Sequence, residues 1–289
     1  MIIDVHTHLV PPRDVMTRAL SAAGKSHPVI DEILGACPDW GYRVERKIDE
    51  AVDFLDRNAI RASVIFPFDF MGATNDLLLR MVKGRPSFVP FACFDLSTAN
   101  VVELEATVKQ AARRGFRGVK LYPLWGPYSE DRYASLFSIT QEMDLPVVVH
   151  SGESMFACVK TEWSHPEIVG TIADKYPSLR LIIAHGGHPY HEATLETIRS
   201  RQNVYTDISA KGMNFLQALV PRAMSSRLHA RVFDKILFGT DLFHPVVYGD
   251  EDAKLAAQLA ALESLGLPRH YLEKILYSNA RTLYNLRIP

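Results

Sequence analysis

With 289 residues, 47% of them hydrophobic, the chain is long enough to bury one large core, and its net charge is only −1. Because Lys and Arg are scattered among Asp and Glu without a basic block, nothing points to nucleic acid or a membrane surface as a partner. Three spaced cysteines without a CxxC pair, no signal-like amino terminus and no run of ~18 apolar residues predict a soluble cytoplasmic protein without disulfides.

Eight short apolar runs alternate with longer amphipathic segments. The apolar runs predict strands at 2–6, 62–66, 88–93, 117–121, 146–150, 180–184, 203–206 and 235–239. The amphipathic segments predict helices at 45–58, 98–114, 129–143, 166–176, 190–200, 213–223 and 251–264. Eight strands that alternate with helices predict a single α/β domain over 1–289, a closed (β/α)8 TIM barrel. A doubly wound open sheet is disfavoured, because His-Thr-His follows the first strand where that fold carries a glycine-rich phosphate loop.

Two connections are too long for simple turns. Residues 9–44, with a short helix near 14–23, follow the first strand, and residues 151–164 follow the fifth. Both leave the carboxyl end of the strands, where long loops build pockets and lids. The tail from 268 to 286 predicts extra C-terminal helices on the barrel exterior.

Side chains that bind metals or transfer protons end five of the apolar runs. They are His6 and His8, Lys120, His150, His185 and Asp241. Parallel strands end at the same rim of a barrel, so these side chains should converge there. Three or more imidazoles and a carboxylate at one place make a hydrolytic metal site.

These residues have simpler explanations when taken singly. His150 and His185 would more often be hydrogen-bonded barrel histidines, and Asp241 has the position of a helix N-cap. In a closed barrel, however, Asp241 follows the last strand and lies beside His6 and His8, which favours a ligand. The two histidines are two residues apart on a strand and share a face.

Two further aspartates have open roles. On a regular strand Asp4 would point to the same face as His6 and His8, but it lies deeper in the barrel. We therefore expect it to form buried hydrogen bonds rather than to bind a metal. Asp207 follows the seventh strand, where it either contacts substrate or caps the next helix.

The sequence resembles the amidohydrolase superfamily, in particular its amidohydrolase-2 branch of metal-dependent TIM-barrel hydrolases and decarboxylases. The matching segments are Ile-Asp-Val-His-Thr-His, Gly-Val-Lys-Leu-Tyr-Pro, Pro-Val-Val-Val-His-Ser-Gly, Ile-Ile-Ala-His-Gly-Gly, Asn-Val-Tyr-Thr-Asp-Ile-Ser and Ile-Leu-Phe-Gly-Thr-Asp. The resemblance runs from residue 1 to Arg281 and implies the metal ligands His6, His8, His150 and Asp241.

The same resemblance leaves two roles open at the site. In one-metal relatives His185 would be a catalytic acid/base or would polarise the substrate, and Lys120 would hold a substrate carboxylate. In two-metal relatives Lys120 would be carboxylated and bridge the ions, and His185 would bind the second ion. The expected cofactor is zinc, with manganese as the alternative, and one ion is favoured over two.

Two enzyme functions follow from such a site. The first is hydrolysis of an amide, ester or lactone in a small molecule by a metal-activated water, with Asp241 and His185 as the catalytic residues. The alternative is non-oxidative decarboxylation, or hydration, of an unsaturated or aromatic carboxylic acid. A purely structural metal site is disfavoured, because it would need no open coordination position.

Substrate-binding residues and assembly are less sharply defined. The substrate contacts expected besides Lys120 are His188 and Trp125, and further candidates are Trp40, Tyr42 and Tyr128 for an aromatic wall and Arg43, Lys160 and Lys211 for a substrate acid. The predicted partner is a small-molecule substrate, and a homodimer is the expected assembly by base rate.

Overall fold

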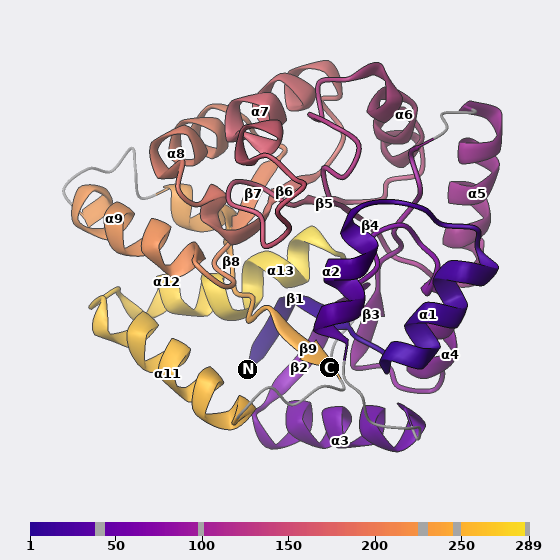
Figure 1. The fold of residues 1–289 in the computed structure, drawn as a ribbon. Helices are drawn as coiled ribbons and strands as arrows, with labels where there is room; N and C mark the ends of the chain where they lie inside the picture. The colour runs from indigo at the N-terminus through magenta and orange to yellow at the C-terminus, as the bar shows by residue number, and fades with distance from the viewer. Residues whose placement is uncertain (38–43, 98–100, 225–230, 245–249, 287–289) are drawn as a thin grey trace.

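The computed structural model describes residues 1–37, 44–97, 101–224, 231–244 and 250–286. In these ranges a ring of parallel strands lies in the centre, and helices surround it (Figure 1). The strands are β1 (Ile2–Leu9), β2 (Ile60–Pro67), β3 (Phe88–Pro90), β4 (Val119–Leu121), β5 (Val147–Val149), β6 (Leu181–Ile183), β7 (Val204–Asp207), β8 (Ile236–Leu237) and β9 (Leu242–His244).

The helices agree with the amphipathic pattern, with two additions. They are α1 (Arg13–Ala22), α2 (Val29–Ala36), α3 (Val44–Arg57), α4 (Asn75–Val82), α5 (Val101–Arg114), α6 (Ala134–Glu142), α7 (Pro166–Lys175), α8 (His191–Ser200), α9 (Gly212–Met224), α11 (Glu251–Ser264), α12 (Arg269–Glu273) and α13 (Asn279–Leu283). The sequence pattern predicts neither α2 nor α4, because eight residues are too few to establish a helical period. None of the helices in the described ranges has both the length and the apolar composition needed to span a bilayer.

The strands follow one another around the ring in sequence order. Hydrogen bonds order them as β3-β2-β1-β9 in one sheet and β4-β5-β6-β7-β8 in the other, all parallel. A bridge between Ala92 and Val119 joins the sheets on one side, and the N–H of Val5 donates to the carbonyl of Phe238 at 2.9 Å on the other. The predicted TIM barrel is confirmed.

The eighth strand differs from the single run predicted at 235–239. β8 ends at Leu237, and the chain resumes as β9, which pairs with β1 through Thr7 and Leu242. Asp241 lies in the break between the two strands, with a φ of 63° that no strand residue adopts. The interruption therefore places the carboxylate at the rim, directly beside the end of β1.

β1 contains an extra residue that changes which side chains share a face. Asp4 pairs with Ser63 and Thr7 with Ile65, so three residues of β1 span two of β2. Residues that pair with each other on neighbouring parallel strands point to the same face of the sheet. His8 therefore points into the barrel with Phe66, and Asp4 points to the opposite face with Ser63. The prediction that Asp4 shares the histidines' face is therefore wrong.

The bottom of the barrel is closed by the C-terminal tail. Inward side chains such as Ile3, Val64 and Phe91 form one buried cluster with Ala280 and Tyr284, from α13 and the residue after it. The Tyr284 ring lies 5.5 Å from that of Phe91. The tail is helical, as predicted, but this end of it plugs the barrel instead of packing only on the exterior.

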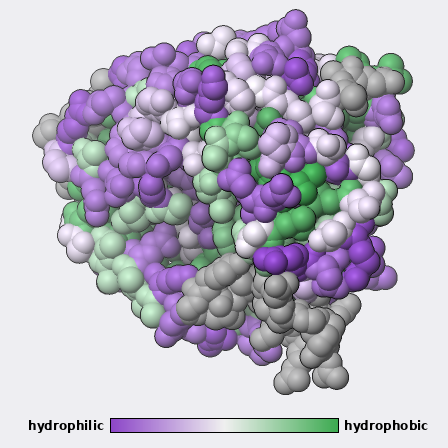
Figure 2. Space-filling model, viewed as in Figure 1, coloured by the Kyte–Doolittle hydropathy of each residue, from purple (hydrophilic) through white to green (hydrophobic). Residues whose placement is uncertain are grey.

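The long loop after β1 covers the opposite end. α1 and α2 contribute Met16, Val29 and Ile33 to a second buried cluster that also contains Phe70 and Tyr122 from the loops after β2 and β4. The N–H of Ala157 donates to Glu32 of α2 at 3.0 Å, which ties this cover to the loop after β5. Figure 2 shows apolar residues gathered over α2 on this face, surrounded by hydrophilic ones.

Candidate active site

The turn that carries Asp241 is held by β1. The buried Asp4 accepts hydrogen bonds from the Thr240 N–H (3.0 Å), the Thr240 hydroxyl (2.6 Å) and the His6 N–H (3.1 Å), which confirms its predicted buried role. The Asp241 N–H donates to the His6 carbonyl at 2.8 Å. A Cβ on Gly239 would lie 2.9 Å from the His6 Cβ, so a glycine is required for this close approach.

The two histidines of β1 lie next to Asp241. Asp241 Oδ1 is 3.2 Å from His8 Nε2 and 3.6 Å from His6 Nε2. Lys120, only 1% exposed, places Nζ 3.1 Å from the same His6 nitrogen. Burial lowers the pKa of Lys120 to about 8, so this ammonium is less firmly protonated than a surface lysine.

His185 approaches this group from the end of β6. One ligand atom each of His6, His185 and Asp241 lie within 4.8 Å of one another, and the two imidazole rings are 4.7 Å apart. Asp207 accepts from His6 Nδ1 at 2.9 Å and from the His185 N–H at 3.0 Å. Its carboxylate is fully buried and does not line the cavity at the site, so of the two roles left open for Asp207 the structure gives no support to substrate contact.

His150 is oriented differently from the other histidines. Its Nε2 is 3.1 Å from the carbonyl oxygen of Glu153, and its ring stacks on Tyr122 at 4.1 Å between centroids. The His150 and His185 rings are 5.2 Å apart. His150 is at the predicted rim, but its nitrogen is used by a backbone carbonyl, and its role as a ligand stays a prediction.

The protonation states at the site suit a cation. Burial lowers the pKa of His6 to about 3 and also lowers the pKa values of His8, His150 and His185, so the imidazoles are neutral. Burial alone would raise the pKa of Asp241, but above all its hydrogen bond with His8 holds that pKa well below its usual range. Neutral imidazoles and an ionised carboxylate are the forms that bind metals, so these residues fit a divalent ion.

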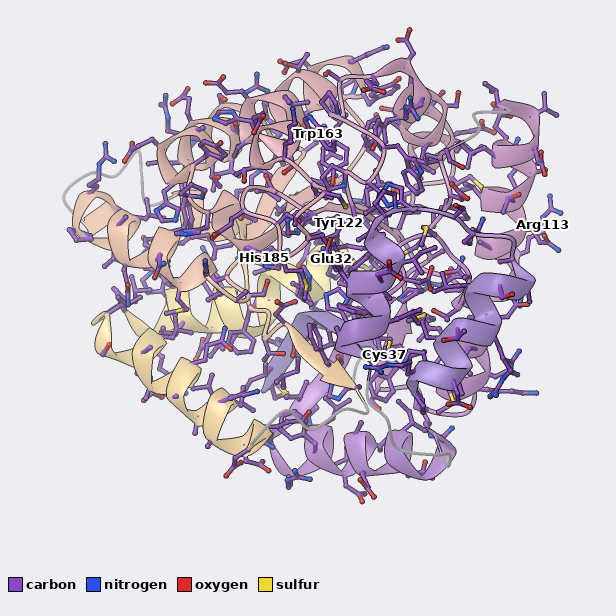
Figure 3. The ribbon with its side chains drawn as sticks, viewed as in Figure 1. Glu32, Cys37, Arg113, Tyr122, Trp163 and His185 are labelled. Atoms are coloured by element: carbon purple, nitrogen blue, oxygen red, sulfur yellow. The ribbon has the colours of Figure 1, made fainter. Side chains whose placement is uncertain are left out.

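The site opens into a cavity of about 260 Å³, and aromatic side chains form the apolar part of its wall. They are Phe68 and Phe70 after β2, Tyr122 after β4 and Phe243 on β9. Figure 3 shows Tyr122 and His185 in the middle of the ring of helices. A small cavity with aromatic walls and a few polar groups is typical of a site for a small organic molecule.

The polar lining of the cavity includes two of the residues named as candidate substrate contacts. His188 lines the cavity, with Nδ1 3.1 Å from His191 Nε2 and Nε2 3.8 Å from Glu153 Oε2. Lys211, a candidate for a substrate acid, also lines it and forms an ion pair with Glu153. Lys160 instead packs over the ring of Trp163.

The predicted aromatic wall is largely replaced by other residues. Trp125 does not line this cavity and packs edge-on against His27 at 6.0 Å, while Tyr128 is buried and donates to the His150 carbonyl at 3.1 Å. Trp40, Tyr42 and Arg43 lie outside the described residues.

The motifs of the sequence do not point to the phenylalanines of the cavity or to Ser209. The aromatic wall of the cavity nevertheless had a signal in Phe66-Pro-Phe-Asp-Phe70, where every second residue is aromatic at and just beyond the end of a strand. Ser209 Oγ lies 2.8 Å from His185 Nδ1, a contact between segments 24 residues apart that no local pattern announces.

Comparison with solved structures finds the same fold in several proteins. One is a putative 2-pyrone-4,6-dicarboxylic acid hydrolase from Pseudomonas putida (TM-score 0.65, 16% identity, covering 100% of this chain and 98% of that one). Another is 5-carboxyvanillate decarboxylase from Novosphingobium aromaticivorans, in complex with manganese and a nitrobenzoic acid (0.66, 15%, 99% and 96%). A third is 4-oxalomesaconate hydratase from Rhodopseudomonas palustris (0.63, 16%, 99% and 96%).

At these identities the likeness concerns the fold alone. A search of curated protein sequences gave no significant match. The model of the amidohydrolase family, by contrast, matches residues 3–286, which include all the strand ends that bear the site. The chain therefore belongs to the amidohydrolase family.

Proposed function

We propose that the protein is a metal-dependent hydrolase that cleaves a C–N or C–O bond, in an amide, ester or lactone, of a small molecule. The observation that carries the proposal is the convergence of His6, His185 and Asp241 beside His8 at a cavity of small-molecule size. A bound divalent cation supplies a Lewis acid and lowers the pKa of a coordinated water from about 15.7 to about 7.

The proposed ligands are His6, His8, His150 and Asp241, with zinc as the first candidate and manganese as the second. The closeness of His185 to His6 and Asp241 supports a second arrangement, in which His185 also binds metal. The neutral imidazoles support either ligand set, because neither needs a proton removed before a cation binds.

Two residues are placed to transfer protons. Asp241 is ionised and partly open to the cavity, so it is suited to accept a proton from an attacking water and pass it to the leaving group. His185 lines the same cavity and would act on the substrate if it does not bind metal. Lys120 would hold a substrate carboxylate or, carboxylated on its amine, bridge a second ion.

A second candidate function is non-oxidative decarboxylation, or hydration, of an unsaturated or aromatic carboxylic acid. The wall of Phe68, Phe70, Tyr122 and Phe243 favours a flat, unsaturated substrate. Lys211 supplies a cation in the same lining, which suits an acid group. A decarboxylase and a hydratase are among the proteins with this fold, which supports the candidate without deciding it.

Metal content is the first test. Protein purified with zinc or manganese present should retain close to one ion per chain by elemental analysis, and a chain that takes up neither ion would overturn both candidate functions. His185→Ala should keep the ion and lose turnover by ~10²–10⁴-fold if His185 transfers protons. Loss of the ion in that variant would instead assign His185 to the ligand set.

A matched control and a substrate screen complete the experiment. His270→Ala removes an exposed histidine of α12 outside the cavity and should change neither metal content nor turnover. Lactones, esters and amides are then screened for hydrolysis, and aromatic acids for release of carbon dioxide. Turnover of acids alone would replace the hydrolase proposal with the decarboxylase.

A further inference from the structure

Asp207 ends β7 as a fully buried carboxylate with four hydrogen-bond donors around it. Oδ2 accepts from His6 Nδ1 at 2.9 Å. Oδ1 accepts from the N–H groups of His185 and Ser209, each at 3.0 Å, and from the Ser209 hydroxyl. These donors occupy both carboxylate oxygens, so neither oxygen faces an acceptor to which a carboxyl proton could be donated. The carboxylate is therefore ionised and can only accept hydrogen bonds.

This acceptor determines where His6 carries its proton. Lys120 Nζ lies 3.1 Å from His6 Nε2, and because an ammonium can only donate, Nε2 is the acceptor there and carries no hydrogen. A neutral imidazole has one N–H, and the nitrogen that faces the Asp207 carboxylate must carry it. The hydrogen therefore lies on Nδ1, and the lone pair of Nε2 points toward Asp241 and Lys120.

The same carboxylate acts on His185 through one intermediate group. The Ser209 hydroxyl has a single hydrogen, which it donates to Asp207. Its oxygen can then only accept from His185 Nδ1, 2.8 Å away. With its one N–H on Nδ1, the neutral His185 ring is also left with a lone pair on Nε2.

We propose that Asp207 is a positioning residue that sets the tautomer of two histidines at once, His6 directly and His185 through Ser209, so that both present an unprotonated Nε2 to the site. The tautomers themselves do not depend on the proposed function; only the role of the two Nε2 atoms in metal binding or proton transfer rests on it. It narrows the role of His185, because an imidazole in this tautomer binds a cation or accepts a proton but donates no hydrogen bond from Nε2 to a developing oxyanion.

The hydrogen bonds run from His6 directly to Asp207 and from His185 through Ser209 to Asp207, so two variants can interrupt them at different points. Ser209→Ala removes the Ser209 hydroxyl with its bonds to His185 and Asp207 and leaves the bond between His6 and Asp207 in place, whereas Asp207→Ala removes both acceptor oxygens and so breaks both connections. Thr206→Val is the matched control, because Thr206 is a buried β7 hydroxyl bonded to the Ile183 carbonyl at 2.8 Å, without a hydrogen bond to either ring. Its loss should cost stability comparable to Ser209→Ala and leave both tautomers unchanged.

The measurement is long-range ¹H–¹⁵N correlation NMR on metal-free protein labelled in histidine, with His6 and His185 assigned by single His→Gln variants. Both residues should carry the proton on Nδ1 in the wild type and in Thr206→Val. Ser209→Ala should change the pattern of His185 alone, and Asp207→Ala that of both. A wild-type proton on Nε2 of either ring, or an unchanged His185 in Ser209→Ala, would overturn the inference.

Zinc affinity, measured by competition with a chromogenic chelator, gives a second readout. Ser209→Ala should bind zinc about 10- to 100-fold more weakly if His185 is a ligand. If Ser209→Ala has an altered His185 tautomer but an unchanged zinc affinity, the hydrogen-bonded connection is supported and His185 is not a metal ligand. If the wild type binds no divalent ion, the proposed function fails, while the NMR result still decides the inference. Should Asp207→Ala not fold, Ser209→Ala alone decides it.

Discussion

Gly239→Ala is expected to disturb the site without adding or removing a functional group. The new Cβ would lie 2.9 Å from the Cβ of His6 and 3.1 Å from that of Ser209, whereas ordinary contact begins at 3.4 Å. His6 must therefore move by about 0.5 Å, which is the tolerance within which a functional site keeps its geometry. His6 lies within β1 and Ser209 just after β7, and both are fully buried, so neither moves freely.

The steric overlap should change both the stability of the protein and its affinity for zinc. Overpacking of this kind costs ~1–3 kcal/mol of unfolding free energy. Displacement of His6 relative to Asp241 should weaken zinc binding by about 10-fold or more. Urea denaturation and chelator competition measure the two effects separately. Gly35→Ala is the matched control, since a Cβ there meets nothing within 4 Å inside α2, and it should stabilise by ~0.5–1 kcal/mol with unchanged zinc affinity. A Gly239→Ala protein that is destabilised but binds zinc like the wild type would refute the link between this glycine and the ligand geometry.

Two further predictions concern stability. Burial raises the pKa of Glu251 to about 7 from 4.5, so the folded state holds this proton more tightly and the wild type should lose stability as the pH rises from 4.5 to 7. In Glu251→Gln this loss should be smaller, and equal urea-midpoint changes between pH 4.5 and 8 in both proteins would contradict the assignment. Tyr284→Phe removes a buried hydroxyl that has no hydrogen-bond partner among the described residues, so the unfolding free energy should stay equal or rise by about 1 kcal/mol. A clear fall in the urea midpoint would show that the hydroxyl is bonded after all.

Much of the architecture was predictable from local pattern. Strands of a barrel are short β-branched runs, and each run here was recognisable because its flanking segments have a helical period. The positions of His6, His8, Lys120, His150 and Asp241 at strand ends followed from the same pattern, because parallel strands all end at one rim.

Register and hydrogen bonding across the barrel were not predictable in this way. The extra residue in β1 reverses the face of Asp4 relative to His8, and a period of two along the sequence contains no sign of it. The break before β9 depends on how closely Gly239 approaches His6, two residues far apart in the chain.

The amino-acid sequence by itself determined the fold and the chemical types at the strand ends, because these follow from local periodicity, and its strand-end motifs were enough to indicate the family by resemblance. Only the tertiary structure decided which of those side chains meet. His6 and Asp207 are 201 positions apart and become partners solely because the barrel brings β1 and β7 around one axis. The proton positions of the histidines depend on such partners, since a buried imidazole places its hydrogen wherever a neighbouring group accepts it.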